Sequence, residues 1–126
     1  NYPYVVMDNE AGMEHLSRLT TKNVEVLLIV TDTSRRGLQA GLRIHKLAKD
    51  LNLGVTKAYI IINQAKNDPS DEVKIMMDEA GLELAGVIPE DEQVYEFDLE
   101  GRPTIEIDAN TPALKAAYSI FDRVIP

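Results

Sequence analysis

Cysteine is absent from all 126 residues of the chain. Its absence excludes disulfide bonds, thiolate metal ligands and a cysteine nucleophile, and it is compatible with a reducing cytoplasm. No apolar run approaches the roughly 20 residues that a membrane-spanning helix needs, and no segment reads as a signal peptide. We therefore expect a cytoplasmic protein that has no membrane partner.

Basic residues are fewer than acidic ones, 13 against 21, and the formal net charge is −8. Because non-specific nucleic-acid binding depends on basic surface, we expect no nucleic-acid partner. The two signs are unevenly distributed. Basic residues concentrate early, at Arg18, Lys22, Arg35, Arg36, Arg43, Lys46 and Lys49, and acidic residues late, at Glu90, Asp91, Glu92, Glu96, Asp98 and Glu100. We interpret these as solvated faces of opposite sign, with a docking surface as the alternative.

A phosphate-binding loop of the form G-x-x-x-x-G-K-[ST] is also absent. The other half of such a site is suggested by the apolar run Tyr4–Met7, which ends in Asp8 and is followed by Gly12. After a strand of an α/β sheet, a carboxylate can hold a Mg²⁺-bound water, and a glycine lets its N–H approach a phosphate. The pattern therefore resembles a Walker B site, with a simple turn and a helix-capping acid as the alternative.

Strand-like and helix-like segments alternate along the chain, which predicts a single α/β domain over residues 1–126. We expect a mostly parallel sheet with helices on both faces. Strands are predicted at Tyr4–Met7, Val24–Val30, Ala58–Ile62 and Leu84–Ile88, the second of them covered on both faces because it is apolar almost throughout.

Helices are predicted to start at Ser34, at an Asp68 N-cap with Pro69 in the first turn, and at Thr111-Pro112. We expect Gly81 to end the second of these. Met13–Thr20 reads as a short helix or an ordered loop. The expected inward stripes are Ile44, Leu47, Ala48 and Leu51; Val73, Met76, Met77 and Ala80; and Leu114, Ala117, Tyr118 and Phe121. His45 we interpret as an ordinary surface histidine.

Asn63 and Pro89 follow the third and fourth predicted strands, as Asp8 follows the first. An Asn side chain offers both a donor and an acceptor to the edge of an adenine ring. The turn from Pro89 to Asp91 adds backbone groups and an apolar ring on which a base can lie. Taken singly, Asn63 is an ordinary loop residue and Pro89 a strand terminator, but together they predict a nucleotide site.

Two segments, Gly86–Asp91 and Glu100-Gly101-Arg102-Pro103, resemble the C-terminal part of the MinD/ParA ATPases, which have a deviant Walker A motif. Within that group, Asp8–Arg18 is most similar to the CooC-type ATPases, which assist nickel insertion into carbon monoxide dehydrogenase. Asp32–Leu38 fits the same subgroup. The resemblance covers nearly the whole chain and implies the C-terminal part of a P-loop NTPase fold that lacks the Walker A half.

The resemblance also implies a role for each matching residue. Asp8 would orient Mg²⁺ through water, and the Gly12 N–H would sense the γ-phosphate in switch II, the segment that includes Glu14, His15 and Arg18. Asn63 would bind adenine, and Pro89 with Asp91 would close the base pocket. The intact protein would use ATP and Mg²⁺ to switch a homodimer that serves carbon monoxide dehydrogenase or a similar nickel enzyme.

The chain departs from the family in lacking the phosphate-loop lysine and a Cys-x-Cys pair. Because it also begins without Met, we suspect a piece of a longer protein. The absent phosphate-loop strand would lie between the first two strands here, so those strands either close up or pair with another copy. We expect the chain alone to be inactive as an ATPase and to hold no nucleotide tightly.

Other functions fit parts of the sequence. A partition or iron–sulfur assembly ATPase of the same family would look similar over these residues. A phospho-receiver domain matches in length and alternation, but this chain has Ile88-Pro89 where a receiver needs a lysine followed by proline. A binding scaffold that uses the basic segment Arg35–Lys49 is the third alternative.

Overall fold

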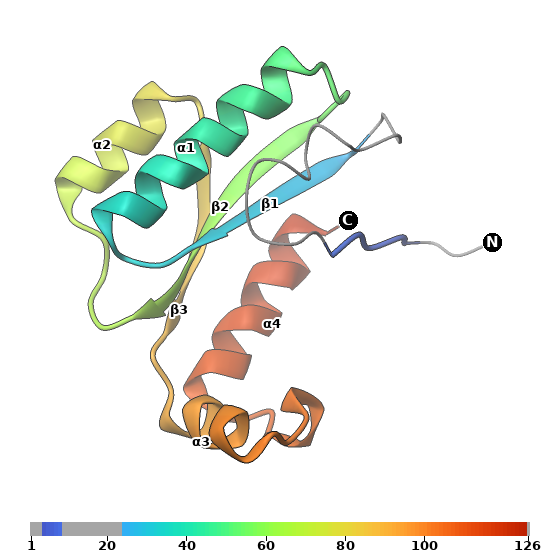
Figure 1. The fold of residues 1–126 in the computed structure, drawn as a ribbon, viewed down its shortest axis with the longest axis vertical. Coiled ribbons are helices and arrows are strands. Elements are labelled where there is room, and N and C mark those ends of the chain that lie inside the picture. Colours follow the sequence, from blue (N-terminus) through green and yellow to red (C-terminus); the bar gives the residue numbers. More distant parts are fainter. Residues whose placement is uncertain (1–3, 9–23, 126) are drawn as a thin grey trace.

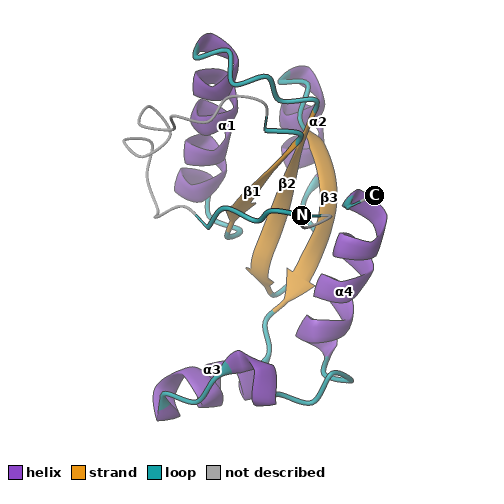
Figure 2. Cartoon of the chain, turned by 90° about the vertical axis from the view of Figure 1, so that its right-hand side faces the viewer, coloured by secondary structure: helices purple, strands orange, loops and turns teal. Residues whose placement is uncertain are grey.

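The structure, a computed structural model, describes residues 4–8 and 24–125. Strands β1 (Val26–Thr31), β2 (Lys57–Ala65) and β3 (Glu83–Pro89) form a parallel sheet in that order. Helices α1 (Arg35–Asp50) and α2 (Asp71–Glu79) cover one face, and α4 (Pro112–Val124) covers the other (Figures 1 and 2). The predicted α/β fold with a parallel sheet is confirmed.

The core alternates between the two faces along the central strand β2. Ile60 and Ile62 pack with Leu38 of α1 and Met77 of α2, whereas Ile61 packs on the opposite side with residues of α4. All three isoleucines are at most 2% exposed. Such a continuous apolar run is typical of a parallel strand covered on both faces.

The helix ends follow local capping chemistry. The Ser34 hydroxyl accepts a hydrogen bond from the Gly37 N–H at 3.0 Å, which confirms the predicted start of α1. The predicted Asp68 cap of α2 is wrong, because the Ser70 hydroxyl takes this position and accepts from the Val73 N–H at 3.4 Å. Gly81 adopts a φ of +72° directly after α2 and confirms the predicted stop.

Helix α4 is rotated relative to the prediction. Tyr118 and Phe121, expected to point inward, are 59% and 41% exposed, while Ala113, Ile120 and Val124 are buried. The reason lies on β3, where a Cβ at Gly86 would be only 2.5 Å from Cγ1 of Ile120. The bare backbone at this position admits Ile120 and sets the face that α4 presents to the sheet.

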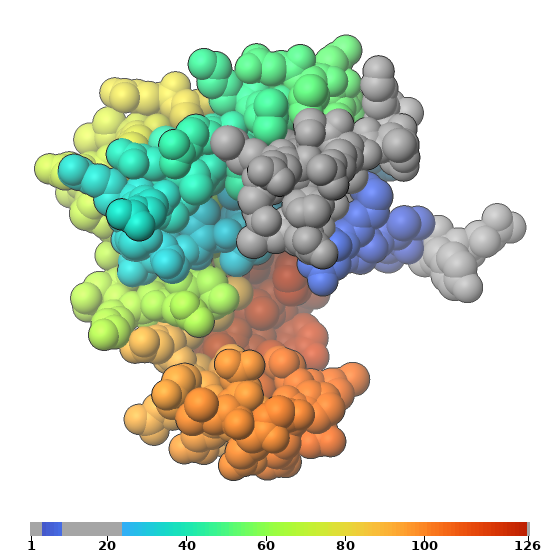
Figure 3. Space-filling view, viewed as in Figure 1, coloured from blue at the N-terminus to red at the C-terminus, as the bar shows by residue number. Residues whose placement is uncertain are grey.

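Helix α3 (Glu92–Glu100) and the 3-10 turn η2 (Thr104–Glu106) lie in the late acidic stretch, where the sequence analysis predicted no helix. Asp91 caps α3, and Gly101 ends it at a φ of +66°. Residues 90–108, orange in Figure 3, form a lobe at the end of the molecule beyond β3. Within the described residues, no helix is long and apolar enough to cross a membrane.

The predicted strand Tyr4–Met7 is wrong for this chain. Residues 4–8 form no strand, and Val5 and Val6 are 81% and 85% exposed. An extended segment becomes a strand only where a neighbour pairs with its backbone, and within the described residues β1 pairs with β2 alone. The first two predicted strands therefore do not close up. Val30 of β1 is 60% exposed, which corrects the expectation that this strand is covered on both faces.

Candidate functional site

The carboxyl ends of the three strands share one edge of the sheet, where ligands bind in open α/β folds. Thr31 ends β1, Asn63 lies two residues before the end of β2, and Pro89 ends β3. The lobe of residues 90–108 begins directly below this edge (Figure 2). The structure thus brings two predicted nucleotide-binding positions, Asn63 and Pro89, onto neighbouring strand ends.

Asn63 sits beside a strained backbone position. Its side-chain oxygen accepts a hydrogen bond from the Gln64 N–H at 2.9 Å, and Gln64 has a φ of +55°, a conformation that non-glycine residues seldom adopt. The pairing of β2 with β3 shifts register between Ile62 and Ala65. Irregular, strained strand ends of this kind concentrate at binding sites.

The turn after Pro89 is held from both sides. Pro89 is paired with Ala65, whose carbonyl accepts from the Glu90 N–H at 2.9 Å. One carboxylate oxygen of Asp91 accepts from the Gln93 N–H at 2.9 Å, and the other from the Ala113 N–H at 3.1 Å. Asp91 therefore joins the first turns of α3 and α4. In this chain it positions the turn, and both its oxygens already have backbone donors.

Asp8 does not join this edge. It is exposed, and its segment lies away from α3, the helix that begins just after Pro89 (Figures 1 and 2). Gly12 lies outside the described residues, as do the predicted segment Met13–Thr20 and His15. The prediction that Asp8, Asn63 and Pro89 share one edge of the sheet is therefore wrong for Asp8, because the strand that would carry it is not formed here. Asn63 and Pro89 do share that edge.

Asp32 is a carboxylate at the same edge that the sequence analysis did not single out. It accepts hydrogen bonds from the Ser34 hydroxyl and from the Ser34 N–H, the latter at 2.9 Å. These bonds favour the ionised form and lower the pKa of Asp32. The sequence Asp32-Thr33-Ser34, an acid followed by two hydroxyl residues directly before a helix, could have identified this position. No group of three or more potential metal ligands gathers within the described ranges 4–8 and 24–125.

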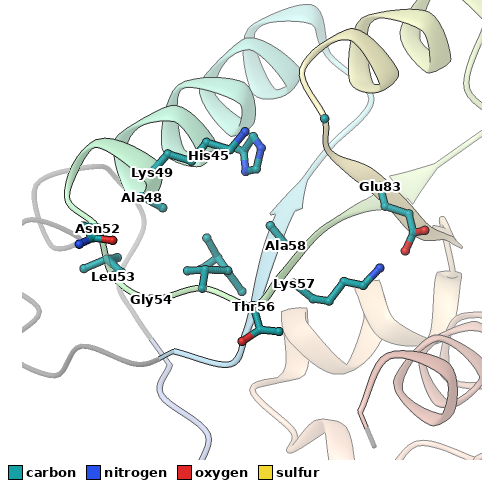
Figure 4. Close-up of a pocket in the computed structure, with 13 residues that line it drawn as sticks. His45, Ala48, Lys49, Asn52, Leu53, Gly54, Thr56, Lys57, Ala58 and Glu83 are labelled. Atoms are coloured by element: carbon teal, nitrogen blue, oxygen red, sulfur yellow. The ribbon is translucent and has the colours of Figure 1, made fainter.

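A pocket of about 420 Å³ opens at the other end of the sheet (Figure 4). Its lining includes Lys57 and Glu83, the first residues of β2 and β3, together with His45 and Lys49 of α1. It is thus separated from Asn63 and Pro89 by the length of the strands, and it is not the predicted nucleotide site.

His45 is buried, with 6% of its surface exposed, so its interpretation as a surface histidine is wrong. Neither ring nitrogen has a well-aligned hydrogen-bond partner in the described part of the chain. Burial lowers the pKa of His45, Lys49 lowers it further, and the Ala80 carbonyl opposes both effects weakly. These effects favour the neutral form of the ring, which lies at the junction of α1 with the α2–β3 turn.

The chain is similar in sequence to several ATP-binding proteins. It is 38% identical over 125 residues to an uncharacterised ATP-binding protein of Methanocaldococcus jannaschii, with 99% of this chain and 49% of the relative covered. It is 37% identical over 127 aligned positions to the carbon monoxide dehydrogenase accessory protein CooC of Rhodospirillum rubrum, covering 97% of this chain and 46% of CooC. The chain spans about half the length of these relatives. No family model matches it.

Solved structures with a similar fold are MinD and ParA ATPases. The MinD cell division protein of Aquifex aeolicus matches 79% of this chain and 43% of its own, with a TM-score of 0.62 and 21% identity. MinD of Pyrococcus horikoshii in complex with Mg-ADP matches 80% of this chain and 41% of its own, with a TM-score of 0.61 and 23% identity. The predicted resemblance to MinD/ParA-type ATPases similar to CooC, and the predicted α/β P-loop NTPase fold, are confirmed.

Proposed function

From its MinD/ParA-type fold and its ATP-binding homologues, we propose that this chain is the adenine-binding, C-terminal part of an ATP-dependent switch protein. In the intact protein, residues 1–126 would follow a half that carries the phosphate loop. The observation that carries this proposal is the strained bulge at Asn63 and Gln64, directly beside Pro89 at the ligand-binding edge of the sheet.

Each residue at this edge would have a different role in binding adenosine. The side-chain NH₂ group of Asn63 would bond the edge of the base, and the Pro89 ring would lie against its face. Asp91 acts through the turn, because its bonds to Gln93 and Ala113 fix the backbone that follows Pro89. Asp8 and Gly12 would act on Mg²⁺ and the γ-phosphate only in the intact protein, where a neighbouring strand would hold their segment.

The client that the homologues favour is carbon monoxide dehydrogenase or a similar nickel enzyme. The 37% identity to CooC supports a cytoplasmic ATPase that assists nickel insertion and switches between monomer and homodimer with its nucleotide state. The ParA family ATPase of Chlorobium tepidum, with a TM-score of 0.60, has the same fold. A partition or iron–sulfur assembly role therefore stays the alternative.

A titration of the ¹⁵N-labelled chain with adenosine and with ATP tests the base site. A stacking surface and a few hydrogen bonds barely offset the free energy lost on association, so we expect roughly millimolar affinity. Adenosine should bind no worse than ATP, because Glu90, Asp91 and Glu92 repel phosphate. Amide shifts should centre on Gln64 and Glu90. Asn63→Ala should abolish them, and Asn67→Ala, an exposed Asn in the following loop, should not.

Two results would contradict this account. Adenosine shifts that avoid the β2 and β3 ends would place the base elsewhere. Micromolar affinity for ATP with shifts at Asp8 and Gly12 would mean that a phosphate site is complete in this chain. We also expect no ATP hydrolysis by the pure chain, so turnover that Asp8→Ala abolishes would refute the assignment of phosphate chemistry to the other half.

A further inference from the structure

The lobe of residues 90–108, which we name the acidic arm, carries almost all of the net charge of the protein. It contains eight acidic residues and one basic residue, for a charge of −7 out of −8 for the chain. The acidic residues are Glu90, Asp91, Glu92, Glu96, Asp98, Glu100, Glu106 and Asp108. This concentration of negative charge attracts cationic partners to this end of the molecule and repels anionic ones.

The one base of the arm is already satisfied within it. Arg102 donates to Glu100 and to Glu106, each at 3.4 Å, and its guanidinium group lies 4.0 Å from the centre of the Phe97 ring. The remaining acidic side chains, all exposed except that of Asp91, therefore have no cation from the arm itself. A partner would have to bring the positive charge.

The outer face of α3 combines this charge with exposed apolar side chains. Val94 and Phe97 are half-buried on the inner face. On the outer face, Tyr95 and Leu99 are 65% and 68% exposed and lie one helical turn apart. A row of exposed acids, Glu92, Glu96 and Glu100, follows the same helix at the same spacing. Ile105 in the next turn is 92% exposed.

The arm presents this face as a preformed surface. Asp91 ties the start of α3 to the start of α4 through Ala113, and Gly101 ends α3 in a left-handed turn whose N–H bonds back to Asp98. The arm lies beyond the end of the sheet, and the described helices α1, α2 and α4 leave its outer face open (Figures 1 and 3). A partner that binds here would not have to order the segment first.

We propose that the outer face of α3 docks a helix of another protein, one with adjacent rows of basic and apolar side chains. Exposed apolar residues within a strongly charged rim mark interaction sites. An acidic row beside an apolar row on one helix is complementary to a basic row beside an apolar row on a partner helix. Nucleic acid and anionic membrane are repelled by the charge. This proposal stands apart from nucleotide binding, because the docking residues Glu92, Tyr95, Glu96 and Leu99 are not assigned to that site.

A second copy of the chain that docks through its basic helix fits only half of this surface. Its helix α1 offers exposed basic residues, Arg35, Arg36, Arg43, Lys46 and Lys49, but its exposed positions include no apolar side chain. Self-association through α1 would therefore satisfy the acidic row and leave Tyr95 and Leu99 in water. A helix from a different protein can supply both rows.

Binding of a fluorescent Leu/Lys peptide tests the proposal. The peptide is about 18 residues long, so that it can form a helix, and places leucines on one face and lysines beside them. We expect Tyr95→Ser/Leu99→Ser to weaken binding about tenfold. The matched control Ile75→Ser/Tyr118→Ser removes apolar residues that are 56% and 59% exposed on α2 and α4, and should leave affinity within about twofold.

A second pair of variants tests the contribution of charge to peptide binding: Glu92→Gln/Glu96→Gln on α3 is compared with Glu72→Gln/Glu79→Gln on α2. The first pair should weaken binding about fivefold at low salt and lose most of that effect at high salt, and the second should change little. Equal binding of a scrambled peptide of the same composition, or insensitivity to the Tyr95/Leu99 variant, would overturn the proposal. So would a self-associated chain in sedimentation that this variant converts to monomer.

Discussion

The two faces of the sheet differ in how completely they are covered. On the face of α1 and α2, one cluster extends across all three strands: Ile29 of β1 and Ile60 of β2 are at most 4% exposed, and Leu84 of β3 packs against the cluster. On the face of α4, the buried cluster lies mainly over β2 and β3. Val30 of β1 is 60% exposed on that side, and Tyr118 and Phe121 of α4 are exposed as well.

This difference shows that one face of the sheet forms its core across all three strands from the described segments, whereas the other does so mainly over β2 and β3. The covered face is made by two crossover helices that lie next to their strands in sequence. Within residues 4–8 and 24–125, α4 is the only helix on the open face, and the outer edge of β1 has no partner strand. Since the relatives are about twice as long, we expect the rest of an intact protein to complete the open face.

Truncating one strand residue on each face should give the largest difference in the free energy of unfolding. Ile60→Ala removes a fully buried side chain on the covered face, and we expect a loss of about 2–5 kcal/mol in the free energy of unfolding. Val30→Ala on the open face should cost less than about 0.5 kcal/mol. Urea denaturation followed by circular dichroism measures both. Similar losses for the two variants would mean that the open face is covered in solution.

Substitutions at the contact between β3 and α4 should give the next largest change in the free energy of unfolding. Gly86→Ala places a Cβ about 2.5 Å from Ile120 and should destabilise the chain by about 1–3 kcal/mol. Ile120→Ala removes the atoms that clash. In a double-mutant cycle, the two substitutions together should therefore destabilise less than the sum of each alone. Strict additivity would show that another contact sets the position of α4.

Local signals predicted much of this fold, because caps and strand runs depend on neighbouring residues. Ser34, Gly81 and the run Ala58–Ile62 were predicted correctly for this reason. The face of α4 was not, since Tyr118 and Phe121 satisfy helical spacing as well as Ile120 and Val124 do. The choice depends on the missing side chain of Gly86, which lies 34 residues before Ile120.

The candidate site was predictable in part for the same reason. Asn63 and Pro89 are found as polar or rigid residues after apolar runs, and the parallel sheet then brings them to one edge. The bond from Ala113 to Asp91 spans 22 residues, and the left-handed Gln64 depends on the register of two strands. Asp8 could not be placed by local pattern, because its strand needs a neighbour that these residues do not supply.

His45 is a buried side chain without a well-aligned hydrogen bond, and its contribution to the free energy of unfolding should depend on pH. The folded state lowers the pKa of His45 below its ordinary 6.5, so the unfolded chain binds the proton more tightly. Its contribution to stability is therefore constant above pH 6.5 and is lost as the pH falls through and below that value. His45→Leu should remove this dependence and stabilise the chain by about 1 kcal/mol at pH 5, since no buried polar group is left unpaired.

Denaturation at pH 5 and pH 8, with an NMR titration of the ring, checks the prediction for His45. The substitution identifies the His45 signal, since the chain has only one other histidine, His15. An apparent pKa at or above 6.5, or an unchanged acid dependence in His45→Leu, would contradict it.

The exposed side chains of α4 should give the smallest effect of all. Tyr118→Ser and Phe121→Ser change residues that are 59% and 41% exposed on the open face, so each should shift the free energy of unfolding of this chain by about 0.5 kcal/mol or less. Ile120→Ser, on the same helix but 4% exposed, serves as the matched control and should cost several times more. Thermal unfolding of the three variants measures the difference. If Tyr118→Ser destabilised the chain as much as Ile120→Ser, with a loss that grew with protein concentration, the open face would be buried against a second copy, and the contrast between the two faces would belong to the single chain only.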